Sequence, residues 1–349
     1  MKIAEKIERF ERVFWKRERG RPPVGVAPAR VWSPVGFLRA PFPRAELAPG
    51  EVGRALARTE YEDAFAGRAV RSDDFMPYVA AWRAVPWLEA ICGCPVRYSS
   101  GSLAPGHFVA SAAELERAPL SREWLARLRA ETAELAAAVP EECFLSTTIL
   151  RGCSDVLAAM RGIDGFCLDL YDDPAPLAAA AARINRLHLD VLDMHFSLVP
   201  PKLGGYGHIF GYWAPGPTTV IQEDMMGLCA PRVYRELFLE HNAAIVEHLG
   251  PHVLFHLHST GYRHYRDVLE IPGLAGLEIT VEANGPRLAD MLPCLRETLE
   301  RSRLILMVDG WFEDLAATVR RLPREGLYVF VSDRYVTSEA EFAALLRAL

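Results

Sequence analysis

The sequence has no excess of basic residues and no apolar run long enough to cross a bilayer. It contains 39 Lys and Arg against 45 Asp and Glu, which gives a formal net charge of −6. A basic surface for nucleic acid is therefore not expected. A membrane helix needs roughly 20 consecutive apolar residues, and no stretch approaches that length. The N-terminus mixes acidic with basic residues and lacks the pattern of a signal or transit peptide.

The chain also lacks a disulfide framework and a dinucleotide-binding loop. Its seven cysteines are scattered, as is typical of a reducing compartment, so we expect a cytoplasmic protein. The closest pair, Cys92 and Cys94, does not have the CxxC spacing of redox or structural zinc sites. No glycine-rich loop follows a predicted strand. No repeat or linker divides the sequence, and we expect a single domain over residues 1–349.

What the sequence does contain is an alternation of strand and helix patterns, most regular after residue 207. Strands are predicted at 24–27, 75–79, 144–150, 209–213, 253–258, 277–281, 304–308 and 327–331. Helices are predicted at 2–19, 51–66, 121–138, 172–198, 231–249, 262–271, 286–300, 311–322 and 338–348. This alternation predicts a parallel α/β fold, and we expect a (βα)8 TIM barrel. Residues 1–70 would form an N-terminal helical and loop extension with the first strand.

The strand at 253–258 carries two histidines on one face. Side chains alternate along a strand, so His256 and His258 should lie opposite Phe255 and Leu257. A glycine, Gly261, follows shortly after the strand. Paired histidines at the end of a buried strand indicate a functional site, although a pair of hydrogen-bonded structural histidines is the plain alternative.

Other polar side chains are expected at the same end of the sheet, because barrel enzymes place function at the carboxyl ends of their strands. In the strand at 277–281 the odd-numbered residues are apolar and should face the helices. Glu278 and Glu282, at even-numbered positions, should therefore point into the barrel. The other candidates at or near strand ends are Arg151, Tyr212, Trp213, Asp224, Asp309, Asp333 and Arg334.

These residue types suit a divalent metal. Two histidines with a carboxylate and an open position are typical of catalytic zinc, and we predict His256, His258, Glu278 and Asp333 as ligands. Without metal, the same groups could act as general acid and base. A polar, mutually paired barrel mouth without chemistry is the third alternative. His256, His258, Glu278 and Asp224 are the predicted catalytic residues.

Several stretches resemble the uroporphyrinogen decarboxylase superfamily. They are His-Leu-His-Ser-Thr-Gly at 256–261, Leu-Glu-Ile-Pro-Gly-Leu at 269–274, Leu-Arg-Gly at 150–152, Tyr-Asp-Asp-Pro at 171–174, and Asp224 with the helix from Pro231. Trp15, Arg-Pro-Pro-Val at 21–24 and Pro-Trp-Leu-Glu-Ala at 86–90 are most similar to uncharacterised, methyltransferase-like members. Those members carry His-Leu-Asp where this chain has His-Leu-His.

The resemblance implies a (βα)8 barrel enzyme that acts on a small molecule, with methyl transfer as the first expectation. The methyl group would come from or go to a corrinoid, which a corrinoid protein could carry, or an O- or N-methyl substrate. His256 and His258 would polarise or protonate the substrate, and Glu278 or Glu282 would balance charge. Tyr212 and Trp213 would wall the pocket. A homodimer is expected at the level of the family.

Two other functions stay open. One is decarboxylation of a carboxylated, tetrapyrrole-like substrate, with Arg30, Arg151 or Arg334 holding a carboxylate and Asp224 or a histidine handling the proton. Glu282 and Asp309 complete the predicted substrate-binding set. The other is a non-catalytic small-molecule binding protein.

The chain departs from both branches of the superfamily at informative positions. Decarboxylases continue their first strand with Met-Arg-Gln-Ala-Gly-Arg, whereas residues 24–30 here are Val-Gly-Val-Ala-Pro-Ala-Arg, so only Arg30 could stand in. Methyltransferases bind zinc through His-x-Cys and a later Cys. Here the match is His258, Ser259 and Thr260, and no cysteine follows Cys294. A metal would then have nitrogen and oxygen ligands, which favours activation of water or a carbonyl over a thiol.

Overall fold

The computed structural model describes residues 2–28, 46–52, 68–99 and 102–349, and its centre is a six-stranded parallel sheet. The order across the sheet is β1 (Val24–Ala27), β13 (Leu327–Ser332), β12 (Arg303–Val308), β11 (Gly276–Val281), β10 (Leu254–His258) and β9 (Val220–Gln222). The predicted parallel α/β fold is confirmed. The predicted helix at 51–66 falls almost wholly outside the described residues, as does Arg30.

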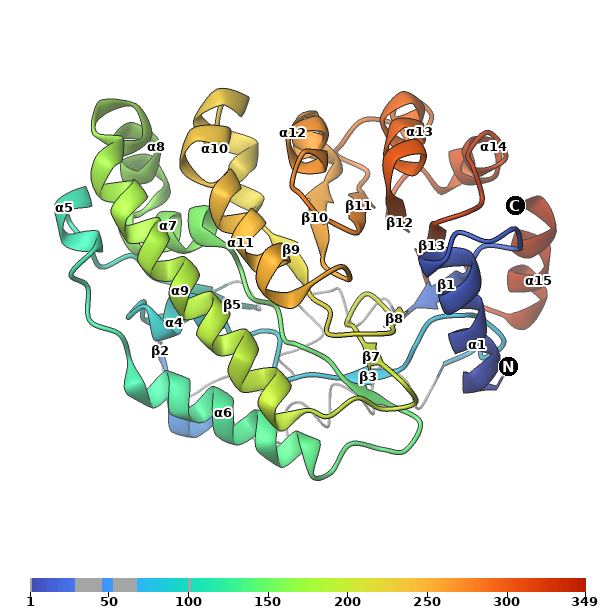
Figure 1. The fold of residues 1–349 in the computed structure, drawn as a ribbon, viewed down its shortest axis with the longest axis horizontal. Coiled ribbons are helices and arrows are strands. Elements are labelled where there is room, and N and C mark those ends of the chain that lie inside the picture. The colour runs from blue at the N-terminus through green and yellow to red at the C-terminus, as the bar shows by residue number, and fades with distance from the viewer. Residues whose placement is uncertain (1, 29–45, 53–67, 100–101) are drawn as a thin grey trace.

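Helices connect successive strands in the C-terminal half of the chain. They are α10 (Pro231–Leu237), α11 (Leu239–Leu249), η5 (Ser259–His264), α12 (Tyr265–Leu269), α13 (Leu292–Arg301), η6 (Phe312–Asp314), α14 (Leu315–Val319) and the terminal α15 (Glu339–Ala348). Figure 1 shows α10, α12, α13 and α14 in sequence order along one side of the sheet.

The N-terminal half is more irregular. Its helices are α1 (Ile3–Arg9), the π-helix η1 (Phe10–Trp15), η3 (Pro49–Glu51), α4 (Trp87–Ile91), α5 (Ala112–Leu115), α6 (Arg122–Ala136), α7 (Cys153–Arg161), α8 (Ile163–Asp172) and α9 (Pro174–Leu198). The predicted helix at 2–19 therefore ends early. An antiparallel sheet of β2 (Glu46–Leu47), β4 (Val96–Ser99) and β5 (Ser102–Pro105) was not expected from the sequence. Within the described chain, no helix has the length and apolar character needed to cross a membrane.

A separate two-stranded sheet belongs to segments that also bond to the two edge strands of the main sheet, β1 and β9. β3 (Tyr78–Val79) pairs in parallel with β6 (Phe144–Leu145). On one side, the Asp74 amide donates to the Val24 carbonyl over 2.8 Å. On the other side, Arg151 forms a parallel bridge with Gln222 of β9. The strand predicted at 144–150 is therefore regular only at its start.

The prediction of a strand at 209–213 is wrong. The structure has a short antiparallel hairpin there, made of β7 (Tyr206–Gly207) and β8 (Trp213–Ala214). Gly211 has a φ of +67°, a backbone conformation that residues with a side chain rarely adopt. A Cβ at this position would overlap the Phe75 ring. The aromatic residues gave the segment a strand-like composition, but this glycine makes it a turn.

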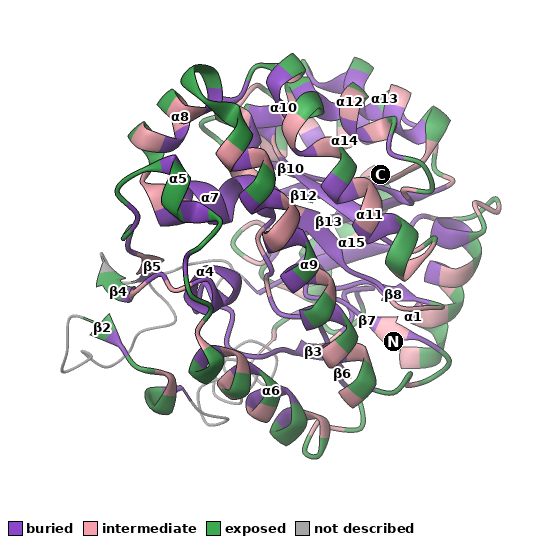
Figure 2. Cartoon of the chain, turned by 60° about the vertical axis from the view of Figure 1, so that its left-hand side comes forward, coloured by how far each residue is buried: buried purple, intermediate pink, exposed green. Residues whose placement is uncertain are grey.

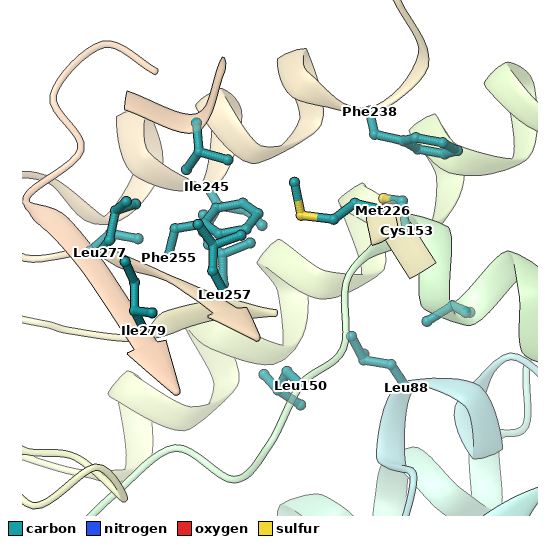
Figure 3. Packing of buried hydrophobic residues seen from close by; sticks show 14 of the residues in the cluster. Leu88, Leu150, Cys153, Met226, Phe238, Ile245, Phe255, Leu257, Leu277 and Ile279 are labelled. Atoms are coloured by element: carbon teal, nitrogen blue, oxygen red, sulfur yellow. The ribbon is translucent and has the colours of Figure 1, made fainter. Parts of the chain in front are cut away.

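The two faces of the main sheet have different neighbours. Phe255, Leu257, Leu277 and Ile279 lie together in the cluster that also contains Ile245 of α11 (Figure 3). The opposite face belongs to a second cluster, whose strand residues are Val220, Leu254, Ile305, Met307, Tyr328 and Phe330. Figure 2 shows the strands of the main sheet as largely buried and the helices as exposed on their outer sides. His256 and His258 share the parity of Leu254, so they project to the second face.

The N-terminal segment packs against this second face. Phe10 contacts Tyr328 edge to face with ring centroids 4.9 Å apart, and Phe14 packs beside Tyr212. Trp15 Nε1 donates to the Trp213 carbonyl over 2.6 Å. These contacts lie near the amino ends of the strands. The opposite, carboxyl ends hold the polar side chains.

Candidate metal centre

The parallel register sets the histidines of β10 beside polar residues of its two neighbours. His256 lies opposite Glu278 of β11 on one side and Gln222 of β9 on the other. His258 is aligned with Thr280. The parity argument from the sequence therefore gives the right arrangement, because these strands pair without a shift that would turn one set of side chains away.

Each imidazole is held through Nδ1 by a glutamate. His256 Nδ1 is hydrogen-bonded to Glu278 Oε2, and His258 Nδ1 lies 2.7 Å from Glu282 Oε1. The glutamates are themselves fixed, since Thr280 Oγ1 donates to Glu278 over 2.9 Å and Ser259 Oγ donates to Glu282 over 3.1 Å. A carboxylate on Nδ1 orients the ring and leaves Nε2 to act as a ligand or base.

The two Nε2 atoms face a shared carboxylate. Asp224 Oδ1 lies 3.9 Å from His256 Nε2 and 3.5 Å from His258 Nε2. Gln222 Nε2 donates to the other oxygen of Asp224 over 2.7 Å. One ligand atom from each of Asp224, His256 and His258 lies within 4.8 Å of the others, and within the described ranges no other set of three such residues does so.

The charges around His258 favour its protonated form in the metal-free protein. Burial lowers the pKa of His258, but the hydrogen bond to Glu282 and the charges of Asp224, Glu282 and Glu278 outweigh it and raise the pKa to about 9. Burial raises the pKa of Glu282, and its hydrogen bond with His258 reverses this, so that the pKa lies below its usual value. A cation is thus favoured between these carboxylates.

Asp224 is the first residue of the 3-10 helix η4 (Asp224–Leu228), which is anchored to α7 by buried carboxyl groups. Asp155 accepts the backbone N–H groups of Asp224 and Met225 over 3.0 and 2.7 Å. Glu223 accepts the N–H groups of Cys153 and Ser154 at the start of α7, over 3.0 and 2.8 Å. Burial, with the charges of Asp224 and Glu223, raises the pKa of Asp155 well above its usual value. These bonds fix the backbone at Asp224, and the hydrogen bond from Gln222 orients its carboxylate.

An aromatic residue that was not predicted forms one wall of the centre. Phe210, at the turn of the β7–β8 hairpin, stacks on His256 with ring centroids 5.6 Å apart and an interplanar angle of 18°. Its neighbour Tyr212, which was predicted at the pocket wall, is fully buried and hydrogen-bonded to Thr218. Trp213 lies with Trp15 near the amino ends of the strands. The turn at Gly211 reverses the chain, so only Phe210 reaches the histidines.

The remaining predicted residues lie around this centre in pairs. Arg151 Nε is 2.5 Å from Glu89 Oε1, and Arg334 Nη2 is 2.9 Å from Asp309 Oδ1. Glu278, predicted as a ligand, instead contacts Nδ1 of His256. Asp333, the fourth predicted ligand, is outside the three-residue group, and its backbone N–H donates to Ala27. Asp224, predicted as catalytic, is the third member of the group that could hold a metal ion.

A cavity of about 680 Å³ begins at Asp224. Its polar lining includes Arg151 and Asp155, and it continues between α7 and α8 toward His107 and Arg161. This volume is in the range of sites for small molecules. Of the three candidate ligands, Asp224 lines this space, which could hold a substrate.

Comparisons with known proteins concern the fold. No protein-family model and no curated protein sequence matches this chain. A methyltransferase from Methanosarcina mazei superposes with a TM-score of 0.60, covering 91% of this chain and 89% of its own, at 14% sequence identity. The chain shares its fold with a methyltransferase. At this identity the likeness extends to the architecture and does not carry over site residues.

Proposed function

We propose that the protein is a metal-dependent enzyme that transfers a methyl group to or from a small molecule. The observation that carries this proposal is the convergence of two imidazole Nε2 atoms and one oxygen of Asp224, while each Nδ1 is occupied by a glutamate. Buried imidazoles that are oriented by carboxylates are the usual setting of a metal ligand. The fold of a methyltransferase supports the choice of reaction.

The residues present fit a divalent ion such as zinc. Asp224, His256 and His258 would hold it, and Asp224 also lines the cavity. Bound there, the ion would act as a Lewis acid that polarises an oxygen of the methyl donor or acceptor. Glu278 and Glu282 keep both imidazoles in the tautomer with Nε2 available, and Phe210 excludes water from one side of His256.

We also propose that the sheet is completed to a (βα)8 barrel of the uroporphyrinogen decarboxylase type. The segments that contain β3 and β6 supply the two strands between β1 and β9 in this proposal. Support comes from the parallel pairing of β3 with β6, the bridge between Arg151 and Gln222, and the bond from Asp74 to Val24. A closed barrel would put the metal centre at its carboxyl mouth.

The methyl carrier would be a corrinoid or the O- or N-methyl substrate itself. A volume of about 680 Å³ suits a small molecule better than a corrin macrocycle, so we place the substrate in the cavity and any corrinoid on a partner protein. A homodimer stays a prediction. Decarboxylation is the second candidate, and the guanidinium of Arg151 at the cavity favours it because it could hold a carboxylate.

Metal content of tag-free protein tests the first part of the proposal. Reconstitution with zinc should give about one ion per chain, and His256→Ala, His258→Ala and Asp224→Asn should each lose most of it. His248→Ala is the matched control, because His248 pairs with Asp193 on the surface and should retain metal. Metal far below stoichiometry in the wild type, after reconstitution, would refute the metal centre.

The reaction class needs a separate assay. Zinc-loaded protein would be incubated with cob(I)alamin and a panel of O- and N-methyl compounds, and with methylcobalamin and acceptors. Spectral conversion between the two cobalamin forms, lost in Asp224→Asn, is the expected result. Release of carbon dioxide from carboxylated compounds, with no cobalamin conversion, would favour decarboxylation instead.

A further inference from the structure

The cavity beside the metal centre contains one arginine whose hydrogen-bonding capacity is mostly unused. Arg151 contacts Glu89 through Nε, and neither terminal nitrogen bonds to any of the described residues. About 30% of the Arg151 side chain is exposed, and it lines the cavity. Glu89 is almost fully buried. A guanidinium in this position offers two parallel N–H donors to the cavity.

The second arginine of the cavity, Arg161, is also paired through Nε, which donates to Asp169 Oδ2 over 2.7 Å within the α7–α8 pair. Arg151 differs from it in position, because its backbone is bridged to Gln222, two residues before Asp224. The cavity carboxylate Asp155 has its oxygens occupied by the amides of Asp224 and Met225. Arg151 is therefore the better anchor for a charged ligand group.

The lining also has an apolar part, which includes Ala158, Ala159, Ile163 and Met225. These side chains accept methylene or methyl groups. The other guanidinium of the lining, Arg161, is already paired with Asp169. At the inner end, Asp224 belongs both to the cavity and to the metal centre. A ligand bound to Arg151 could therefore reach the metal.

We propose that the substrate of this site is a small monocarboxylate, whose carboxylate binds the terminal nitrogens of Arg151 while its reactive oxygen or nitrogen lies at Asp224. Two parallel N–H groups match the two oxygens of a carboxylate. The inference rests on the proposed function for the identity of the reacting end only. The anion subsite itself needs no metal.

Glu89 adjusts the strength of this subsite. Its buried carboxylate partly neutralises Arg151, so that the guanidinium binds the substrate with lower affinity and releases it more readily. Replacing Glu89 by glutamine keeps the shape and removes the counter-charge. Glu89→Gln should therefore bind carboxylates several-fold more tightly than the wild type does.

Ligand-observed NMR with 3-methoxypropionate and its neutral amide tests the proposal, in metal-free and in zinc-loaded protein. The wild type should prefer the carboxylate about tenfold, which is the size of one charge-assisted hydrogen-bonded pair. Arg151→Met should abolish the preference, Arg151→Lys should keep part of it, and Arg161→Met should leave it intact. Circular dichroism and thermal melting establish that each variant is folded.

Several outcomes would overturn the subsite. These are equal affinities for carboxylate and amide in the wild type, loss of the preference in Arg161→Met but not in Arg151→Met, or no gain in Glu89→Gln. Inorganic phosphate that binds more tightly than the carboxylate, with the same dependence on Arg151, would overturn the assignment to a carboxylate. If zinc binds and the preference is absent, this inference fails alone. If the preference is present and zinc does not bind, the proposed metal centre fails alone.

Discussion

Each histidine at the strand ends is held by a glutamate through Nδ1, and this leaves Nε2 directed at Asp224. The glutamates do more than orient the rings. A carboxylate on Nδ1 makes the imidazole a stronger base at Nε2, and it would do so for either a metal or a proton. The chemistry of the site therefore depends on Glu278 and Glu282 as much as on the groups they hold.

Glu278→Gln and Glu282→Gln should each weaken zinc binding by roughly 10- to 100-fold without abolishing it. The imidazole ligands remain, but each loses the carboxylate that orients it and raises the basicity of its Nε2. Competition with a chromophoric chelator measures the affinity. Glu297→Gln, which alters a glutamate bonded to Tyr265 and Arg266 on the surface, is the control. Unchanged affinity in both site variants would mean that the glutamates do not support a metal.

In the metal-free protein, His258 should titrate at a pH of about 9, as its raised pKa requires. Because the folded-state pKa exceeds the unfolded value, this group stabilises the fold fully below about pH 6.5 and ceases to do so as the pH rises through 9. NMR titration of the imidazole measures it. In Glu282→Gln the pKa should fall toward 6.5, and a wild-type value at or below 6.5 would contradict the electrostatic account.

Much of the site could be predicted from strand parity, and the rest could not. Parity and the polar even positions of 277–281 bring His256, His258 and Glu278 together, as found. Which nitrogen of each imidazole is free depends on interatomic distances that no sequence pattern contains. Asp333 was expected at the centre because it follows a strand. In the structure Asp224 lies there instead, because of the strand register and the geometry of the 3-10 helix that begins at Asp224.

Among the elements, the β7–β8 hairpin has the largest influence on the site. It reaches into the second face of the sheet and brings Phe210 against His256. The turn depends on Gly211, whose φ of +67° and lack of a side chain permit its approach to Phe75. A short, irregular segment thus holds the Phe210 ring against His256 of the candidate metal centre.

Gly211→Ala should lower the free energy of unfolding by about 2–4 kcal/mol, since the left-handed backbone is strained and the new methyl group overlaps Phe75. Urea denaturation followed by circular dichroism measures the loss. Gly227→Ala is the control, because a Cβ there would meet nothing within 4 Å, and it should change stability by less than about 0.5 kcal/mol. Similar stability in both variants would show that the hairpin turn is not strained.

The main-sheet strands are the elements that the sequence predicts best. The predicted strands at 24–27, 253–258, 277–281, 304–308 and 327–331 each match the structure to within one residue at either end. They are apolar because they are covered on both faces. β9 was missed because it is only three residues long. The π-helical turn at Phe10–Trp15 has no sequence pattern that distinguishes it from an α-helix.

At the scale of the molecule, a buried ion cluster joins the N-terminal segment to the sheet. Asp74 is ion-paired with Arg9 and Arg21 and accepts the Val24 N–H of β1 over 2.9 Å. Its neighbour Asp73 accepts the Val26 N–H over 2.7 Å and pairs with Arg68. These carboxylates have no exposed surface, so their positive partners must stay in place.

Asp74→Asn should destabilise the protein by about 2–3 kcal/mol, because it leaves two half-buried guanidinium groups without their shared, buried counter-charge. Chemical denaturation measures the change. Glu18→Gln breaks the exposed pair with Arg12 and should cost less than about 1 kcal/mol. A small effect of Asp74→Asn would mean that the N-terminal segment is held by its aromatic contacts alone.

The pairing of β1 with β13 has a consequence for the order of assembly on the ribosome. The strands that carry the candidate metal centre are consecutive, β9 to β11, and can pair soon after they are synthesised. β1 must wait for β13, the last strand, and until then Phe10 lacks its contact with Tyr328. The nascent chain therefore keeps Phe10 without this contact until the end of its synthesis, after the strands of the candidate metal centre are complete.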